Sequence, residues 1–97
     1  MRYEIQLAPE AVEDLERLRA HDRAQLKDAM ETHLRHQPTK TSRSRIKRLR
    51  GLSKPRYRLR VGEFRVFYDV TKRQVEVLAI VAKSDAGEWL EKAGERP

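Results

Sequence analysis

The chain has 97 residues, contains no cysteine and carries a formal net charge of +7. This length suffices for one hydrophobic core, and the absence of cysteine excludes disulfides and thiolate-bound metals. No apolar run approaches the roughly 20 residues that a membrane span needs, and the polar start, Met1 to Ile5, does not resemble a signal peptide. We therefore expect a single cytoplasmic domain over residues 1–97.

The first third of the chain predicts one strand followed by a pair of helices. Arg2 to Leu7 alternates polar and apolar residues, as a half-buried strand does. A first helix is expected from Pro9, because proline suits the first helical position, and a second from a cap at Asp22 to about His36. The short break between them predicts an antiparallel pair. The expected apolar stripes are Ala8, Ala11, Val12, Leu15 and Leu18, and then Leu26, Ala29, Met30, His33 and Leu34.

The surplus of positive charge lies in one block. Residues 40–60 hold ten Lys or Arg and no acid, whereas the segments before and after this block each hold more acidic than basic residues. A block of one sign repels itself unless it is solvated or meets phosphate or carboxylate groups. Because aromatic residues alternate with the arginines in this region, we favour nucleic acid as the partner over a merely solvated surface.

The segment Lys54 to Asp69 predicts a β-hairpin. Its loop is Gly62-Glu63, with glycine in the first position as a type II′ turn requires. If Val61 pairs with Phe64, Arg60 stands opposite Arg65, and like charges facing each other across two strands are destabilising. Such a local conflict is typical of a functional site. In this register the apolar face holds Tyr57, Leu59, Val66 and Tyr68, and the basic face holds Arg56, Arg58, Phe67 and Asp69.

The remaining segments predict the rest of the sheet and a last helix. Arg45 to Arg50 is expected as an edge strand, and Val75 to Ala82 as a central strand because it is apolar on both faces. Asp85 to Glu88 is similar to a capping box and opens a short helix that carries Trp89. We therefore predict an α+β domain: a small, mostly antiparallel sheet of about four strands, packed by the helix pair, with a short C-terminal helix.

The candidate chemistry of this sequence is cationic. His33 and His36 lie three residues apart, but no carboxylate or cysteine set completes a metal site, so we expect no metal and no cofactor. The arginines of the predicted basic face could clamp a phosphodiester and neutralise charge that grows in a transition state. Phe67 leaves two alternatives open, since it could stack on an RNA base or be covered by a neighbouring element.

With these residues in hand, the chain resembles toxins of the RelE/ParE superfamily from bacterial type II toxin–antitoxin systems. The resemblance extends over nearly the whole chain and is carried by Ala11 to Leu18, Lys47 to Gly51 and, most specifically, Tyr57 to Asp69. It implies a sheet packed by a helix pair, a basic concave surface and a cognate antitoxin as partner. In the RelE branch it also implies cleavage of messenger RNA on the ribosome.

The resemblance also implies roles for individual residues. Arg56, Arg58 and Arg65 match the basic hairpin residues that bind and polarise the scissile phosphate in the RelE branch. Lys83 is the nearest match to a basic residue that follows the last strand, although Ser84 fits that position equally. We expect further RNA contacts from the rest of the basic block and the hairpin, namely Arg45, Lys47, Arg48, Arg50, Lys54, Arg60 and Phe67.

The C-terminal region departs from the family pattern. Many nucleolytic members carry a tyrosine or histidine there for proton transfer, whereas this chain offers Glu88, Trp89 and Leu90. An indole N–H cannot act as a general acid or base near neutral pH. A nuclease would therefore depend on arginine electrostatics, on Lys83, or on an acid such as Asp69 or Glu63.

Three functions consequently stay open. The first is a toxin that cleaves messenger RNA. The second is a ParE-like toxin that inhibits DNA gyrase by binding protein, which the missing Tyr or His favours. The third is a catalytically attenuated relative that mainly binds its antitoxin.

Overall fold

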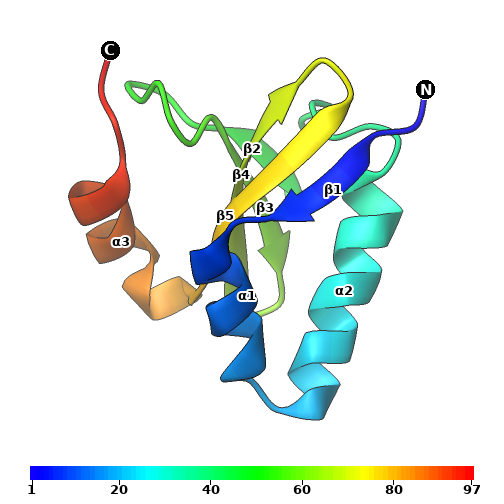
Figure 1. Ribbon diagram of the computed structural model, residues 1–97. Coiled ribbons are helices and arrows are strands. Elements are labelled where there is room, and N and C mark those ends of the chain that lie inside the picture. Colours follow the sequence, from blue (N-terminus) through cyan, green and yellow to red (C-terminus); the bar gives the residue numbers. More distant parts are fainter.

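A five-stranded β-sheet runs through the centre of the molecule, and the computed structural model describes all residues from 1 to 97 (Figure 1). Across the sheet, the strands are β1 (Glu4–Leu7), β5 (Gln74–Ala82), β4 (Phe64–Thr71), β3 (Tyr57–Val61) and β2 (Ile46–Arg48). β1 pairs with β5 in parallel, and the other neighbours pair antiparallel. The mostly antiparallel sheet is confirmed, with five strands where about four were expected.

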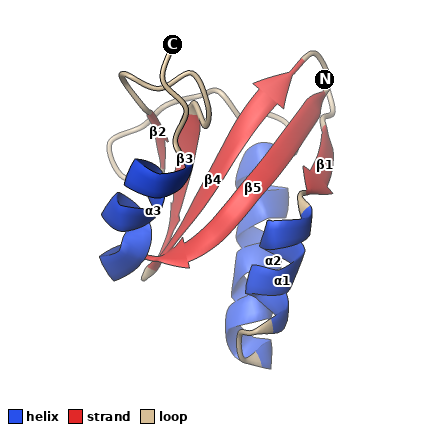
Figure 2. Cartoon of the chain, turned by 60° about the vertical axis from the view of Figure 1, so that its left-hand side comes forward, coloured by secondary structure: helices blue, strands red, loops and turns tan.

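Two helices, α1 (Pro9–Glu16) and α2 (Ala20–Leu34), cover one face of this sheet (Figure 2). They run in opposite directions, as the short link between them predicts. The core lies between these helices and the sheet, where Leu15, Leu26 and Leu34 are buried together with Leu59 and Val66. No helix combines the length and the apolar character that crossing a bilayer requires.

Two details of the helices differ from the prediction. Val12 is 40% exposed, because α1 turns the i and i+4 pair Ala11 and Leu15 toward the core and leaves Val12 beside it. α2 begins at Ala20 without a side-chain cap. Asp22 therefore lies inside the first turn, where its charge interacts favourably with the helix dipole.

The predicted register of the central hairpin is confirmed. Val61 stands opposite Phe64, and Arg60 stands opposite Arg65. Gly62 has a φ of +54°, and Glu63 keeps a negative φ, which together fit a type II′ turn. The edge strand β2 is shorter than the predicted strand from Arg45 to Arg50. Only Ile46, Lys47 and Arg48 pair with residues of β3.

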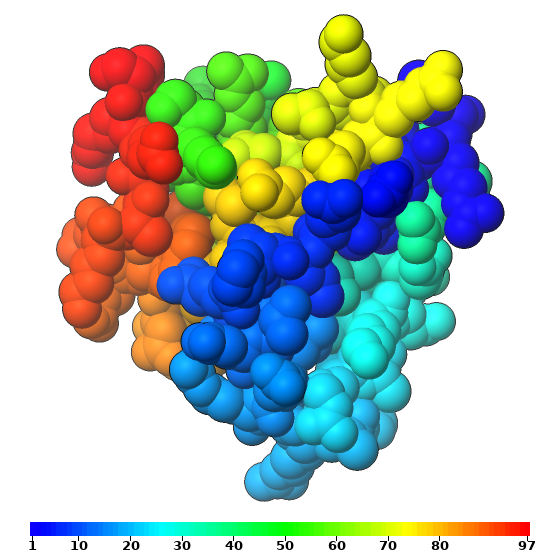
Figure 3. Space-filling view, viewed as in Figure 1, coloured from blue at the N-terminus to red at the C-terminus, as the bar shows by residue number.

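A short C-terminal helix covers part of the opposite sheet face. A single 3-10 turn (Lys83–Asp85) leads into α3 (Ala86–Ala93). The capping box expected here does not form, since Asp85 makes no side-chain hydrogen bond at the N-terminus of α3. Beyond the helix, the backbone N–H of Glu95 donates to the carbonyl oxygen of Lys54 at 2.7 Å. Figure 3 shows this red C-terminal segment packed beside the green segment before β3.

Candidate functional site

The sheet face opposite α1 and α2 carries a cluster of cations, Lys47, Arg58, Arg60 and Arg65, which we call the arginine face. Along β3 and β4 these arginines alternate with buried core residues and therefore lie on the other side of the sheet. Lys47 pairs with Arg58 from the edge strand and adds the fourth cation. None of the four forms an ion pair. The cations that do are Arg17, Arg35, Lys54 and Lys92.

Arg58 is half-buried in the middle of the arginine face. Its Nε atom is buried and has no hydrogen-bond partner. Burial lowers the pKa of Arg58, and the charges of Arg65 and Arg60 lower it further. A buried donor without a partner is unfavourable, so an anion bound at Arg58 would satisfy this donor and also offset the repulsion among the three arginines.

Arg65 is only 6% exposed and braces the hairpin turn. Its Nη1 atom donates to the carbonyl oxygens of Gly62 and Phe64, each at 2.9 Å. One arm of this guanidinium is therefore committed to the backbone. Its charge nevertheless remains on the arginine face, where it raises the positive potential around Arg58 and Arg60.

Arg56 and Lys83 lie at opposite ends of the hairpin. The backbone N–H of Arg56 donates to Asp69 Oδ1 at 2.7 Å, at the end away from the turn. The backbone N–H of Lys83 donates to the carbonyl oxygen of Glu63 at 2.7 Å, which places Lys83 beside the turn. There Lys83 lines an open cavity of about 490 Å³ together with Glu63, Ala82 and Ser84.

The other predicted RNA-binding cations are more scattered. Arg45 lies next to the arginine face, with Nη1 at 3.4 Å from the carbonyl oxygen of Arg60. Arg48 lies on the helix side of the sheet, 5.9 Å above the ring of Tyr57. Lys54 forms an ion pair with Glu76 at 3.7 Å, and Arg50 lies exposed in the loop that precedes the hairpin. The structure therefore gathers only part of the basic block into one surface.

Phe67 lies on the same sheet face as Arg58 but is fully buried. The ring of Trp89 from α3 stacks on it, with centroids 4.8 Å apart and an angle of 7° between the planes. Trp89 Nε1 also donates to Glu10 Oε2 at 3.1 Å, which ties α3 to the start of α1. Of the two alternatives for Phe67, cover by a neighbouring element is observed, and its stacking on an RNA base stays a prediction.

The family follows from a comparison of the whole chain with protein-family models. Residues 5–87 match the model described as the ParE toxin of the type II toxin–antitoxin system parDE. The chain belongs to this ParE toxin family. Among curated proteins, none matches the toxin significantly in sequence.

Solved structures show the same fold. The toxin superposes on a chain of the archaeal RelE–RelB complex from Pyrococcus horikoshii OT3 with a TM-score of 0.70 at 21% identity, covering 86% of the toxin and 97% of that chain. For the RelB–RelE complex of Methanococcus jannaschii the TM-score is 0.63 at 20% identity, with 86% and 95% covered. For RelBE2 of Mycobacterium tuberculosis it is 0.61 at 20% identity, with 84% and 99% covered. The expected RelE-like fold is confirmed.

The groups that could move a proton in the toxin lie around the arginine face, not within it. Asp69 is half-buried at the far end of the hairpin, where burial raises the pKa of its carboxyl and the hydrogen bond from Arg56 N–H partly opposes this rise. Glu88 is engaged with Lys92 at 2.8 Å. Glu63 remains exposed in the turn, in the cavity that Lys83 also lines.

Proposed function

We propose that this toxin inhibits translation by cleaving messenger RNA on the ribosome, without a metal, and that a cognate antitoxin neutralises it. The observation that carries the proposal is the arginine face, where four cations lack any carboxylate partner and the Arg58 Nε atom lacks any acceptor. RNA phosphates provide acceptor oxygens and negative charge at regular intervals along one strand.

Electrostatic stabilisation is the proposed source of the rate enhancement. The ribose 2′-hydroxyl loses its proton and its oxygen bonds to phosphorus, the bond from phosphorus to the 5′-oxygen breaks, and the leaving 5′-oxygen takes up a proton. Negative charge grows on the phosphoryl oxygens in this step, and donors fixed before the reaction stabilise it. Arg58 is the proposed direct donor, while Arg60 and Arg65 supply positive potential around it. Proton transfer then falls to Lys83 or Glu63, because both line the open cavity beside the turn.

Primer-extension mapping of messages after induction of the toxin tests this proposal. Cuts are expected within translated messages, and Arg58→Gln should reduce cutting by about 100-fold, as loss of one charge-stabilising donor does. Arg73→Gln is the matched control, because it removes the same kind of charge from the exposed β4–β5 turn. Intact messages in cells arrested by the wild-type toxin would rule the proposal out.

A second candidate function is inhibition of DNA gyrase by protein binding. It is favoured by the match to the ParE family model and by Trp89 standing in the region where nucleolytic relatives carry Tyr or His. Under this alternative, induction gives a DNA-damage response while messages stay intact. An attenuated toxin would instead produce no growth arrest.

A further inference from the structure

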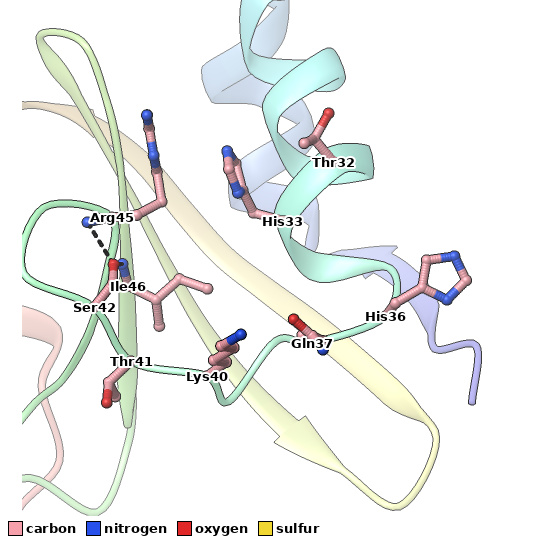
Figure 4. A pocket seen from close by; sticks show the side chains of 9 residues that line it. All are labelled: Thr32, His33, His36, Gln37, Lys40, Thr41, Ser42, Arg45 and Ile46. Carbon is pink, nitrogen blue, oxygen red and sulfur yellow. Dashed lines mark hydrogen bonds between the residues drawn. The ribbon is translucent and has the colours of Figure 1, made fainter.

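A cavity of about 330 Å³ opens between the end of α2 and the loop that leads to β2, around the sheet edge from the arginine face (Figure 4). Eight of the nine residues that line it are polar, and none of them is acidic. Its basic side chains come from three segments: His33 from α2, Lys40 from the loop and Arg45 from the position just before β2. Figure 4 shows His33 and Arg45 on facing walls.

The walls of this cavity are held in place by the core. The buried hydroxyl of Tyr68 donates to the carbonyl oxygen of Pro38 at 2.6 Å and so anchors the loop. Ser42 Oγ accepts the backbone N–H groups of Arg45 at 3.0 Å and Ile46 at 3.3 Å. Because its lone pairs are occupied in this way, the Ser42 hydroxyl is left to donate its own proton to a further acceptor.

We propose that this cavity is a second phosphate-binding site. Its basic and hydroxyl groups come from three segments that line one cavity without an acidic residue, and a phosphate group offers several acceptor oxygens to such donors. The phosphate could belong to an RNA backbone or to a free mononucleotide. The backbone N–H of Arg60 donates to the carbonyl oxygen of Arg45 at 2.9 Å, so the arginine face and the cavity are neighbours at the edge of the sheet. An RNA strand bound on the arginine face could therefore continue over this edge to the cavity. In its RNA form the inference rests on the proposed function.

His33 and His36, which are spaced like metal ligands, both line this cavity. His36 lies at the rim, and its Nδ1 atom is 3.3 Å from the carbonyl oxygen of Met1. His33 faces inward, and burial together with the charge of Arg45 lowers the pKa of its ring. A phosphate bound among His33, Arg45 and Lys40 would oppose both effects, so the pKa of His33 should rise when the site is filled.

The test follows the histidine ring signals of the purified toxin by NMR during titration with AMP, with a short 2′-O-methyl oligoribonucleotide, and with glutamate as the carboxylate probe. His33 should shift saturably with AMP or with the oligonucleotide, while His21 should not. A response to the oligonucleotide alone identifies RNA as the source, and a response to AMP alone identifies a free nucleotide. No saturable shift of His33, or an equal shift with glutamate, would overturn the proposal.

Variants separate this site from the arginine face. Lys40→Gln should weaken phosphate binding by about tenfold, and it is exposed enough to leave the fold intact. Lys72→Gln, in the β4–β5 turn, is the matched control. Neither AMP nor the 2′-O-methyl oligonucleotide can be cleaved, so these probes measure binding alone. If the toxin binds them in this cavity but cuts no message, the second phosphate site is supported and the proposed messenger RNA cleavage is contradicted. Binding that survives Lys40→Gln but is lost in Arg60→Gln contradicts the site.

Discussion

The three arginines at the centre of the arginine face differ in what their surroundings allow them to do. Arg60 is exposed, Arg58 is half-buried with an unpaired Nε atom, and Arg65 is buried with Nη1 bonded to the backbone. The alternating sequence pattern placed all three on one face and did not predict these differences in burial. Arg65 therefore braces the turn. Under the proposed function, the exposed Arg60 is the cation that RNA meets first, and Arg58 is the donor to its phosphate.

Arg65→Ala is therefore expected to destabilise the fold before it affects any ligand. It removes the hydrogen bonds to Gly62 and Phe64, and charge-assisted bonds of this kind contribute about 1.5–3 kcal/mol. The free energy of unfolding from urea titration should fall by about 2 kcal/mol. Arg60→Ala should change it by less than about 0.5 kcal/mol. Equal losses in both variants would show that the turn does not depend on the guanidinium.

Tyr68 gives the fold a pH dependence in the alkaline range. Burial raises the pKa of its phenol, and the neighbouring Tyr57 raises it further. The unfolded chain loses this proton near pH 10 while the folded chain keeps it, so stability is complete below about pH 10 and falls above it. The slope should approach about 1.4 kcal/mol per pH unit. Urea titrations across this range should show the slope in the wild type and lose it in Tyr68→Phe.

Among the three α-helices, α3 is the one that contains no buried residue. It is held mainly by the Trp89 stack on Phe67, the hydrogen bond to Glu10 and the backbone bonds at Glu95. Elements with few buried contacts open at lower free energy than the core. Opening of α3 would uncover Phe67 beside Arg58, and an aromatic ring next to a cation is a surface on which a base can stack.

Trp89 reports directly on this opening, because it is the only tryptophan of the chain. In a urea titration, its fluorescence should change at a lower urea concentration than the far-UV circular dichroism does. Glu10→Ala should widen the gap between the two transitions, since it removes the acceptor of the Trp89 N–H. Lys92→Ala, which breaks only the exposed pair with Glu88, should leave the gap unchanged. Coincident transitions in all three proteins would mean that α3 unfolds together with the sheet.

The sequence predicted the elements whose determinants are local. The hairpin register followed from the alternation on both arms and from Gly62 in the turn. Contacts between distant segments were not predictable in this way. Trp89 and Glu10 are separated by 79 residues, so nothing in either segment reveals that one meets the other over Phe67. The exposure of Val12 was not predicted for a related reason. The apolar stripe of a helix does not reveal how much of that stripe the rest of the protein covers.

For the molecule as a whole, the net charge of +7 comes from residues 40–60, where Lys54 is the one cation that forms an ion pair. A multivalent phosphate should therefore stabilise the folded toxin by binding to it. Tripolyphosphate should raise Tm by about 5 °C in thermal unfolding, well above the effect of sodium chloride at equal ionic strength. Arg58→Gln should lower this increment and Arg73→Gln should not. Identical increments for both salts would indicate general screening instead of a site.

The position of β5 in the sheet affects when the chain can fold during its synthesis. Residues 74–82 form the strand between β1 and β4, so the N-terminal strand has no partner until that late segment has been made. α1, which packs mainly on β5, waits for the same segment. Such non-local pairing makes assembly a late event during synthesis. A growing chain therefore carries the arginines of β3 and β4 before β5 and β1 complete the sheet, so we expect the finished arginine face to form late in synthesis.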